Sequence, residues 1–304
     1  MSRILKMALA VVVSIGVLGS SSSFGAAARP VTASFLFGAA VDDLRTSRQR
    51  LPALEAELGR PVDIASTYVD WSYVFPGPTE KWMAAGGKRQ VLISWEPWKI
   101  RFRDVAAGRQ DSYLAAVAKA MRAYPYDVYV RPWPELNGNW STWQPTPAGD
   151  KRDGGTPTEF VAAWRHVVSF FRDRGVRNLK FVFNVDASDL PSNTRVPAIW
   201  PGSAYVDVLG LDGFNWNEGG WRSFRQIFAP MYATVTGLDP RLPVWVTEFG
   251  CAPGPDRPAW LSAMMTTRAF PRLRAVVYFD VRSRLDWRLG AADRRAIRPH
   301  LRGR

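Results

Sequence analysis

Short apolar segments with the composition of β-strands recur along this chain of 304 residues and alternate with segments of helical periodicity. The strand-like segments are residues 34–40, 63–68, 90–95, 127–131, 179–184, 206–211, 244–247 and 275–279. Such alternation is typical of a parallel sheet joined by crossover helices. Eight units of this kind predict an α/β fold, a single (β/α)8 TIM barrel with its functional site at the carboxyl ends of the strands.

The helical periodicity is clearest over residues 157–174, where five apolar side chains fall on one face: Phe160, Trp164, Val167, Val168 and Phe171. Thr156 and Glu159 form a capping box before this segment, and Gly175 is expected to end it. A helix is also expected over residues 41–58, ended by Gly59.

The first 28 residues have a composition of their own. Arg3 and Lys6 are followed by an apolar run over residues 7–18 and by three small residues, Ala26 to Ala28. This pattern predicts a secretory signal peptide over residues 1–28, removed before a catalytic domain of residues 29–304. An uncleaved membrane anchor is the alternative. We therefore expect a secreted or cell-surface protein.

The chain is strongly basic, and its formal net charge of +13 falls to +11 when Arg3 and Lys6 are removed. The cations are scattered over the predicted helices, so we expect attraction to an anionic cell-wall or membrane surface and no nucleic-acid partner. Cys251 is the only cysteine, which excludes an intramolecular disulfide. His166 and His300 lack ligand spacing, so neither a metal nor another cofactor is expected.

Polar residues follow the predicted strands at the ends where a barrel carries its site. These residues are Glu96, Glu135, Asn184, Asp212 and Glu248. One acidic residue at such a position is often a structural ion pair. Five positions of this kind indicate a functional cleft.

The segment DVYVRPWPELNGNWSTW, residues 127–143, gathers Arg131, Glu135 and Asn137 with two tryptophans, Trp140 and Trp143. A carboxyl group can protonate a glycosidic oxygen, Arg and Asn side chains bind hydroxyls, and an indole face accepts the apolar side of a pyranose. These residues predict a sugar-binding catalytic cleft, with Trp216 and Trp287 as further stacking platforms. The alternative is a buried Arg131–Glu135 pair with core tryptophans.

Several motifs resemble glycoside hydrolase family 26, a family of retaining β-glycanases on a TIM barrel that is best known for β-mannanases. RPWPELNGNW resembles the fourth-strand segment that carries the general acid/base, and WVTEFG resembles the seventh-strand segment that carries the nucleophile. The resemblance implies that Glu135 is the acid/base and Glu248 the nucleophile. It also implies an endo-β-mannanase that degrades polysaccharide by double displacement, with its two carboxyl groups about 5 to 5.5 Å apart.

Two positions depart from that family pattern. Pro134 stands where the family commonly has His, and Phe214 stands where it commonly has a Tyr whose hydroxyl would hydrogen-bond the nucleophile. We expect Arg131 and Asn137 to hold Glu135 and its neighbours. Glu96, Asn184 and Asp212 are further substrate-binding candidates.

The leading hypothesis is a secreted, monomeric endo-β-glycanase acting on β-1,4-mannan. A mixed-linkage β-glucanase of the same fold is the nearest alternative. The changes at Pro134 and Phe214 motivate a second class, a non-catalytic barrel that binds glycan or cell wall. The basic C-terminal segment, residues 294–304, alone suggests a protein that organises an anionic wall polymer.

Overall fold

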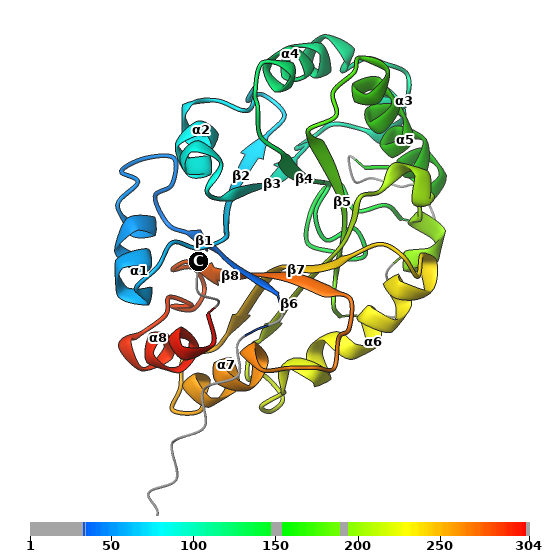
Figure 1. Ribbon diagram of the computed structural model, residues 1–304. Coiled ribbons are helices and arrows are strands. Elements are labelled where there is room, and N and C mark those ends of the chain that lie inside the picture. The colour runs from blue at the N-terminus through cyan, green and yellow to red at the C-terminus, as the bar shows by residue number, and fades with distance from the viewer. Residues whose placement is uncertain (1–32, 34, 147–153, 189–193, 302–304) are drawn as a thin grey trace, which may run out of the picture. The chain divides into compact units, whose positions relative to one another are not determined.

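The computed structural model describes residues 33, 35–146, 154–188 and 194–301. In this part of the chain eight parallel strands form a closed barrel in chain order, each paired with its neighbours and β8 with β1 (Figure 1). The strands are β1 (Leu36–Val41), β2 (Ile64–Asp70), β3 (Gln90–Glu96), β4 (Val128–Pro132), β5 (Leu179–Asp186), β6 (Val208–Asn215), β7 (Val244–Cys251) and β8 (Leu273–Asp280). The predicted (β/α)8 barrel is confirmed.

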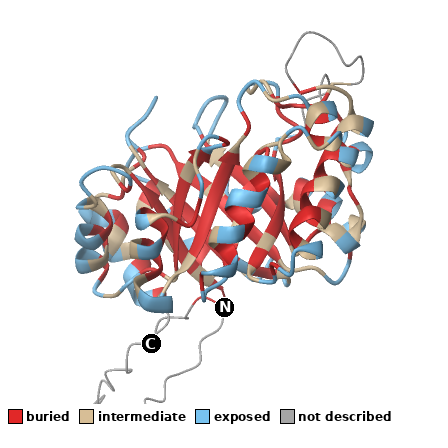
Figure 2. Ribbon diagram, turned by 90° about the horizontal axis from the view of Figure 1, so that it is seen from above, coloured by how far each residue is buried: buried red, intermediate tan, exposed pale blue. Residues whose placement is uncertain are grey.

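Helices surround the barrel (Figure 1). They are α1 (Arg50–Leu58), α2 (Pro78–Ala84), α3 (Phe102–Ala106), α4 (Asp111–Arg122), α5 (Pro157–Asp173), α6 (Phe224–Leu238), α7 (Arg257–Met265) and α8 (Ala291–Ile297). Short 3-10 turns lie at η1 (Ala85–Gly87), η2 (Val196–Ile199), η3 (Ser203–Tyr205) and η4 (Arg298–His300). Figure 2 shows buried strands and helices that are exposed on their outer faces, so the main apolar core lies between the two layers.

The inside of the barrel changes from apolar to polar toward the carboxyl ends of the strands. A separate cluster, which we name the apolar plug, fills its middle; it consists of Ile64, Leu92, Val182, Val208, Trp245, Ala275 and Val277. Successive side chains of a strand point to opposite faces of the sheet. The residues two and four positions after a residue of the apolar plug therefore point into the barrel as well. On β2, β3 and β5 these positions hold only polar side chains: Ser66, Tyr68, Ser94, Glu96, Asn184 and Asp186.

Helix α5 forms as predicted. The Thr156 hydroxyl accepts a hydrogen bond from the Glu159 N–H at 3.2 Å, and the Glu159 carboxylate accepts one from the Thr156 N–H at 2.8 Å. Gly175 follows the helix with φ of 73°, in the left-handed region that glycine adopts at low cost.

The predicted helix over residues 41–58 is wrong in its first half, because α1 begins only at Arg50. Asp43 turns the preceding chain: its carboxylate accepts hydrogen bonds from the N–H groups of Gln49 and Arg50. An aspartate bonded to nearby backbone donors competes with helix in this way. The predicted signal peptide, residues 1–28, lies outside the described residues. Within those residues no helix has the length and hydropathy needed to span a membrane.

Candidate active site

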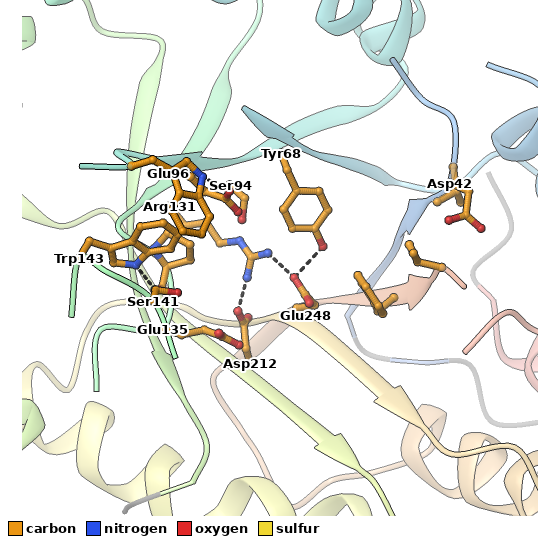
Figure 3. A pocket seen from close by; sticks show the side chains of 15 residues that line it. Asp42, Tyr68, Ser94, Glu96, Arg131, Glu135, Ser141, Trp143, Asp212 and Glu248 are labelled. Carbon is orange, nitrogen blue, oxygen red and sulfur yellow. Dashed lines mark hydrogen bonds and ion pairs between the residues drawn. The ribbon is translucent and has the colours of Figure 1, made fainter. Parts of the chain in front are cut away.

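A cavity of about 410 Å³ opens at the carboxyl ends of the strands. Glu96 ends β3, Asp212 and Glu248 lie on β6 and β7, and Arg131 comes from β4. Glu135 enters the same space from the loop after β4 (Figure 3). The wall is completed by further side chains that include Asp42, Tyr68, Ser94, Trp98 and Trp143. The structure thus brings both predicted catalytic glutamates into one cavity.

Glu248 is held through one of its two carboxylate oxygens. The Tyr68 hydroxyl donates a hydrogen bond to Oε2 at 2.7 Å, and the Arg131 guanidinium forms an ion pair with the same oxygen. Figure 3 shows both contacts. Within the described residues, Oε1 of Glu248 has no hydrogen-bond partner. Oε1 is therefore the oxygen that is available to a ligand in the cavity.

A register shift between β6 and β7 gives Glu248 its position. Leu211 pairs with Val246 and Asp212 with Glu248, so Thr247 is the extra residue on β7. Such a bulge redirects the side chains that follow it. The Thr247 side chain is buried, and its hydroxyl donates a hydrogen bond to Asp212 Oδ1 at 2.7 Å.

Arg131 is buried and forms ion pairs with Asp212 and Glu248 together. A buried arginine needs this compensation, because an unpaired charge in the protein interior is strongly unfavourable. Burial raises the pKa of Asp212, and the positive charge of Arg131 opposes that shift. We expected Arg131 to hold Glu135; in the structure it holds the other glutamate, because β4 directs it across the barrel toward β6 and β7.

Glu135 lies in a tightly bonded turn with φ of 56°, a left-handed value that costs a residue other than glycine of order 1 kcal/mol. Its N–H donates to Asn184 Oδ1 at 2.7 Å, and its carbonyl accepts from the Gly138 N–H at 2.9 Å and from Gln144 Nε2 at 3.1 Å. These bonds fix the backbone of Glu135 over the cavity.

The surroundings of the Glu135 carboxyl group favour its protonated form. Burial, together with the negative charges of Asp212, Glu248 and Asp186, raises the pKa of Glu135 well above its usual range. The indole N–H of Trp140 donates to Glu135 Oε2 and acts in the opposite direction. Burial also raises the pKa of Glu96, whose Oε2 accepts a hydrogen bond from Trp98 Nε1 at 3.0 Å.

A second cavity, of about 340 Å³, shares Glu135 with the first. Its other lining residues are Trp140, Asp186, Ser188, Phe214 and Trp216. Trp140 and Trp216 are 48% and 36% exposed, so their rings are accessible. Glu135 thus stands between a cavity that contains Glu248 and one bordered by exposed indoles.

Three residues that we expected to bind substrate are buried behind the cavities. Asn184 binds the Glu135 N–H, while Asn137 Nδ2 donates to the carbonyls of Asp186 and Ser188 at 3.0 and 3.1 Å. Trp287 is fully buried against Phe214 and Trp216. The prediction that Asn137, Asn184 and Trp287 contact the sugar directly is therefore wrong. These three residues pack behind the cavities and support the residues that line them. We expected Asn137 to hold Glu135; in the structure its side chain binds the backbone of Asp186 and Ser188.

Trp143 lines the larger cavity but is only 3% exposed, because its Nε1 donates to the Pro134 carbonyl at 2.8 Å and its ring packs against Trp98. It is not the solvent-facing platform that we expected. Trp98 is 49% exposed and occupies the outer position instead.

Sequence reasoning missed Tyr68 and Asp186. Tyr68 supplies the hydroxyl contact to Glu248 that we thought absent because Phe214 replaces a tyrosine on β6. Both residues follow inward-facing polar positions on their strands, Ser66 on β2 and Asn184 on β5. The alternation of side chains along each strand is the sequence signal that could have identified them. No group of histidine, cysteine or acidic side chains with metal-binding geometry occurs among residues 33, 35–146, 154–188 and 194–301.

Known proteins resemble this chain in sequence. The family model for glycosyl hydrolase family 26 matches residues 106–241. Endoglucanase H of Acetivibrio thermocellus is 29% identical over 255 residues, which is 81% of this chain. A mannan endo-1,4-beta-mannosidase of Bifidobacterium adolescentis is 31% identical over 107 residues, or 33% of this chain. The chain spans 28% of the length of the first relative and 10% of the second.

Solved structures share the fold at low sequence identity. A β-mannanase of family 26 from Bacteroides ovatus has a TM-score of 0.64 and 17% identity, over 88% of this chain and 90% of that chain. A mannanase from Bacillus subtilis has a TM-score of 0.62, also at 17% identity, over 87% of this chain and 85% of that chain. The chain is therefore similar in sequence to glycosyl hydrolase family 26 over residues 106–241, and it shares the barrel fold of solved members of that family.

Proposed function

We propose that this chain is an endo-β-glycanase that hydrolyses β-1,4-mannan by a double displacement with retention of configuration. The observation that carries the proposal is the pair Glu135 and Glu248, which share one cavity in opposite electrostatic settings. Burial and neighbouring negative charge favour a protonated Glu135, whereas Glu248 is paired with a cation. Retaining glycosidases need this combination of an acid and an ionised nucleophile.

In the first step, Glu248 Oε1 attacks the anomeric carbon of the bound sugar. The bond between that carbon and the glycosidic oxygen breaks while Glu135 donates its proton to the departing oxygen. The products are a glycosyl ester on Glu248, an alcohol and a Glu135 carboxylate. Tyr68 and Arg131 both bind Oε2, which leaves Oε1 directed at the substrate.

In the second step, the Glu135 carboxylate takes a proton from a water molecule as its oxygen attacks the anomeric carbon. The ester bond to Glu248 breaks and the glutamate regains its charge, so both groups return to their starting states. The two inversions leave the sugar product in the β-configuration of the substrate.

Mixed-linkage β-glucan is the second candidate substrate. The relative that aligns with 81% of this chain is named an endoglucanase, whereas the mannosidase of Bifidobacterium adolescentis aligns with 33%. Matches to the family's mannanases favour mannan, and the length of the endoglucanase match favours glucan.

We further propose that residues 1–28 direct export. The N-terminal sequence of exported protein should then begin near Ala28 or Arg29, and an intact Met1 in the membrane fraction would contradict this.

The decisive experiment measures reducing-sugar release from mannan, mixed-linkage β-glucan and cellulose, with the Glu135→Gln and Glu248→Gln variants as matched controls. Release from mannan that both substitutions abolish supports the leading proposal, and proton NMR of the first product should show the β-anomer. Release from glucan alone supports the second substrate. Binding to a glycan without release from it supports the non-catalytic alternative, and neither binding nor release refutes the whole assignment.

A further inference from the structure

The smaller cavity lies beside the catalytic pair and has a lining of its own. It shares Glu135 with the larger cavity but does not include Glu248. Trp140 and Trp216 present accessible rings there. An exposed indole face next to polar side chains is a common surface for a pyranose ring, because the C–H side of the sugar is apolar and its rim carries hydroxyls.

Asp186 is the acidic side chain that this cavity adds. It ends β5 and is 7% exposed. Its Oδ1 accepts a hydrogen bond from the Ser188 N–H at 2.6 Å, the Ser188 hydroxyl donates a second hydrogen bond to this carboxylate, and no cation in the described part of the chain forms an ion pair with it. A carboxylate that is nearly buried, lacks a cation and borders a cavity is expected to find its remaining hydrogen bonds in a ligand.

The backbone around Asp186 is fixed on both sides. Its N–H donates to Asn137 Oδ1 at 2.7 Å, and its carbonyl accepts from Asn137 Nδ2 at 3.0 Å. Asn137 is itself buried. This two-way contact explains why the motif contains an asparagine that does not reach the cavity: it positions Asp186 relative to Glu135.

We propose that Asp186 determines which sugar is accepted as the leaving group, because its carboxylate accepts hydrogen bonds from the hydroxyls of the sugar that departs into the cavity lined by Trp140 and Trp216. The inference rests on the proposed hydrolysis, since the sugar under attack must lie over Glu248 and the departing sugar on the other side of Glu135. A carboxylate at this position favours neutral sugars with free hydroxyls and disfavours sugars that carry a carboxylate, because like charges repel at close range. Burial raises the pKa of Asp186 to about 6, so the group is mostly ionised at pH 7.5.

The test compares Asp186→Asn with the wild type on two substrates that share the same glycone. One is an oligosaccharide of the glycan that the wild type cleaves, and the other is its trifluoroethyl glycoside, whose alcohol also needs a proton to leave but places no sugar in the smaller cavity. We expect kcat/KM for the oligosaccharide to fall about 10- to 150-fold, the effect of one hydrogen bond to a charged group. For the trifluoroethyl glycoside we expect a change of less than about threefold.

Asp173→Asn is the matched control, because it removes one exposed negative charge from the end of α5. Both of its kinetic constants should equal those of the wild type. If Asp186→Asn lowers the melting temperature substantially, Asp186→Glu replaces it. That variant keeps the charge but displaces the carboxylate, and it should show the same selective loss on the oligosaccharide.

Two kinetic outcomes overturn the proposal. An equal loss on both substrates means that Asp186 acts through the protonation of Glu135, and unchanged kinetics on both means that it does not touch the sugar. If the wild type cleaves nothing, the proposed hydrolysis has failed, and the affinity of the oligosaccharide for each variant is then measured by calorimetry. Weaker binding to Asp186→Asn supports the sugar contact, and equal binding refutes it.

Discussion

Tyr68→Phe removes a single hydroxyl from the contact that holds Glu248. That hydroxyl lies 2.7 Å from Oε2, and Arg131 is the other group bound to the same oxygen. Burial and the charge of Glu248 raise the pKa of Tyr68, so the hydroxyl keeps its proton and remains a donor throughout the working pH range. Without it, the carboxylate is free to turn about its bond to Arg131, and Oε1 loses its fixed direction.

A hydrogen bond to a charged group contributes about 1.5 to 3 kcal/mol, which corresponds to about 10- to 150-fold in rate if it is needed in the transition state. We expect kcat on a cleaved glycan to fall within this range. KM should change little, because the bond orients the nucleophile and does not touch the sugar. Steady-state kinetics on a defined oligosaccharide give both constants.

Tyr129→Phe is the control for this experiment. It makes the same change on β4, but at the base of the barrel, where Tyr129 packs against Trp245 with ring centroids 4.3 Å apart. Its kinetics should match the wild type. The proposed role of Tyr68 is refuted if Tyr68→Phe retains kcat/KM within twofold of the wild type, or if its loss of activity follows a loss of folded protein in a melting experiment.

Three further predictions follow from the site. Glu248→Ala should release an inverted glycosyl azide when azide is added with an activated aryl glycoside, whereas Glu135→Ala should yield the retained azide; NMR of the products distinguishes them, and identical products would contradict the assigned roles. Trp143→Ala should lower the free energy of unfolding by about 3 to 5 kcal/mol, because the indole is buried; a loss below 1 kcal/mol in a denaturant titration would mean that the ring is exposed in solution. Trp140→Phe removes a donor that favours the ionised form of Glu135, so the pKa of this acid should rise and the alkaline limb of kcat/KM should move to higher pH; an unmoved limb would show that the indole N–H does not act on the carboxyl group.

The barrel and five polar positions at its mouth were predictable from the sequence because both depend on local pattern. Short apolar runs identify strands, and a parallel barrel gathers the residues that follow them at one end. Glu96, Glu135, Asp212 and Glu248 accordingly meet in the larger cavity. Strands β5 to β7 run two to four residues further than expected, since polar residues inside the mouth continue the pairing while departing from the apolar pattern.

The depth of each aromatic side chain was not predictable in this way. Trp140 and Trp143 are three residues apart in one loop, yet one is half exposed and the other is buried by a bond to the Pro134 carbonyl. Exposure depends on how the loop folds back over β4, which composition does not record. Asn137 and Asn184 show the same limit for polar residues, because an amide that binds backbone has the same sequence signature as one that binds a sugar.

The apolar plug also bears on how protons would reach Glu135 and Glu248 in the proposed reaction. Its seven side chains, of which none is more than 4% exposed, lie inside the barrel on the side away from the polar residues of the mouth. Apolar side chains offer water and protons no hydrogen-bond partners, so we expect both to enter from the mouth, the side on which the proposed substrate would bind. While a polysaccharide covered that mouth, Glu135 would exchange protons mainly with the glycosidic oxygen and with water admitted after the leaving group departs. In the proposed reaction, a barrel that is closed to water at its base would therefore favour proton donation first and water entry second.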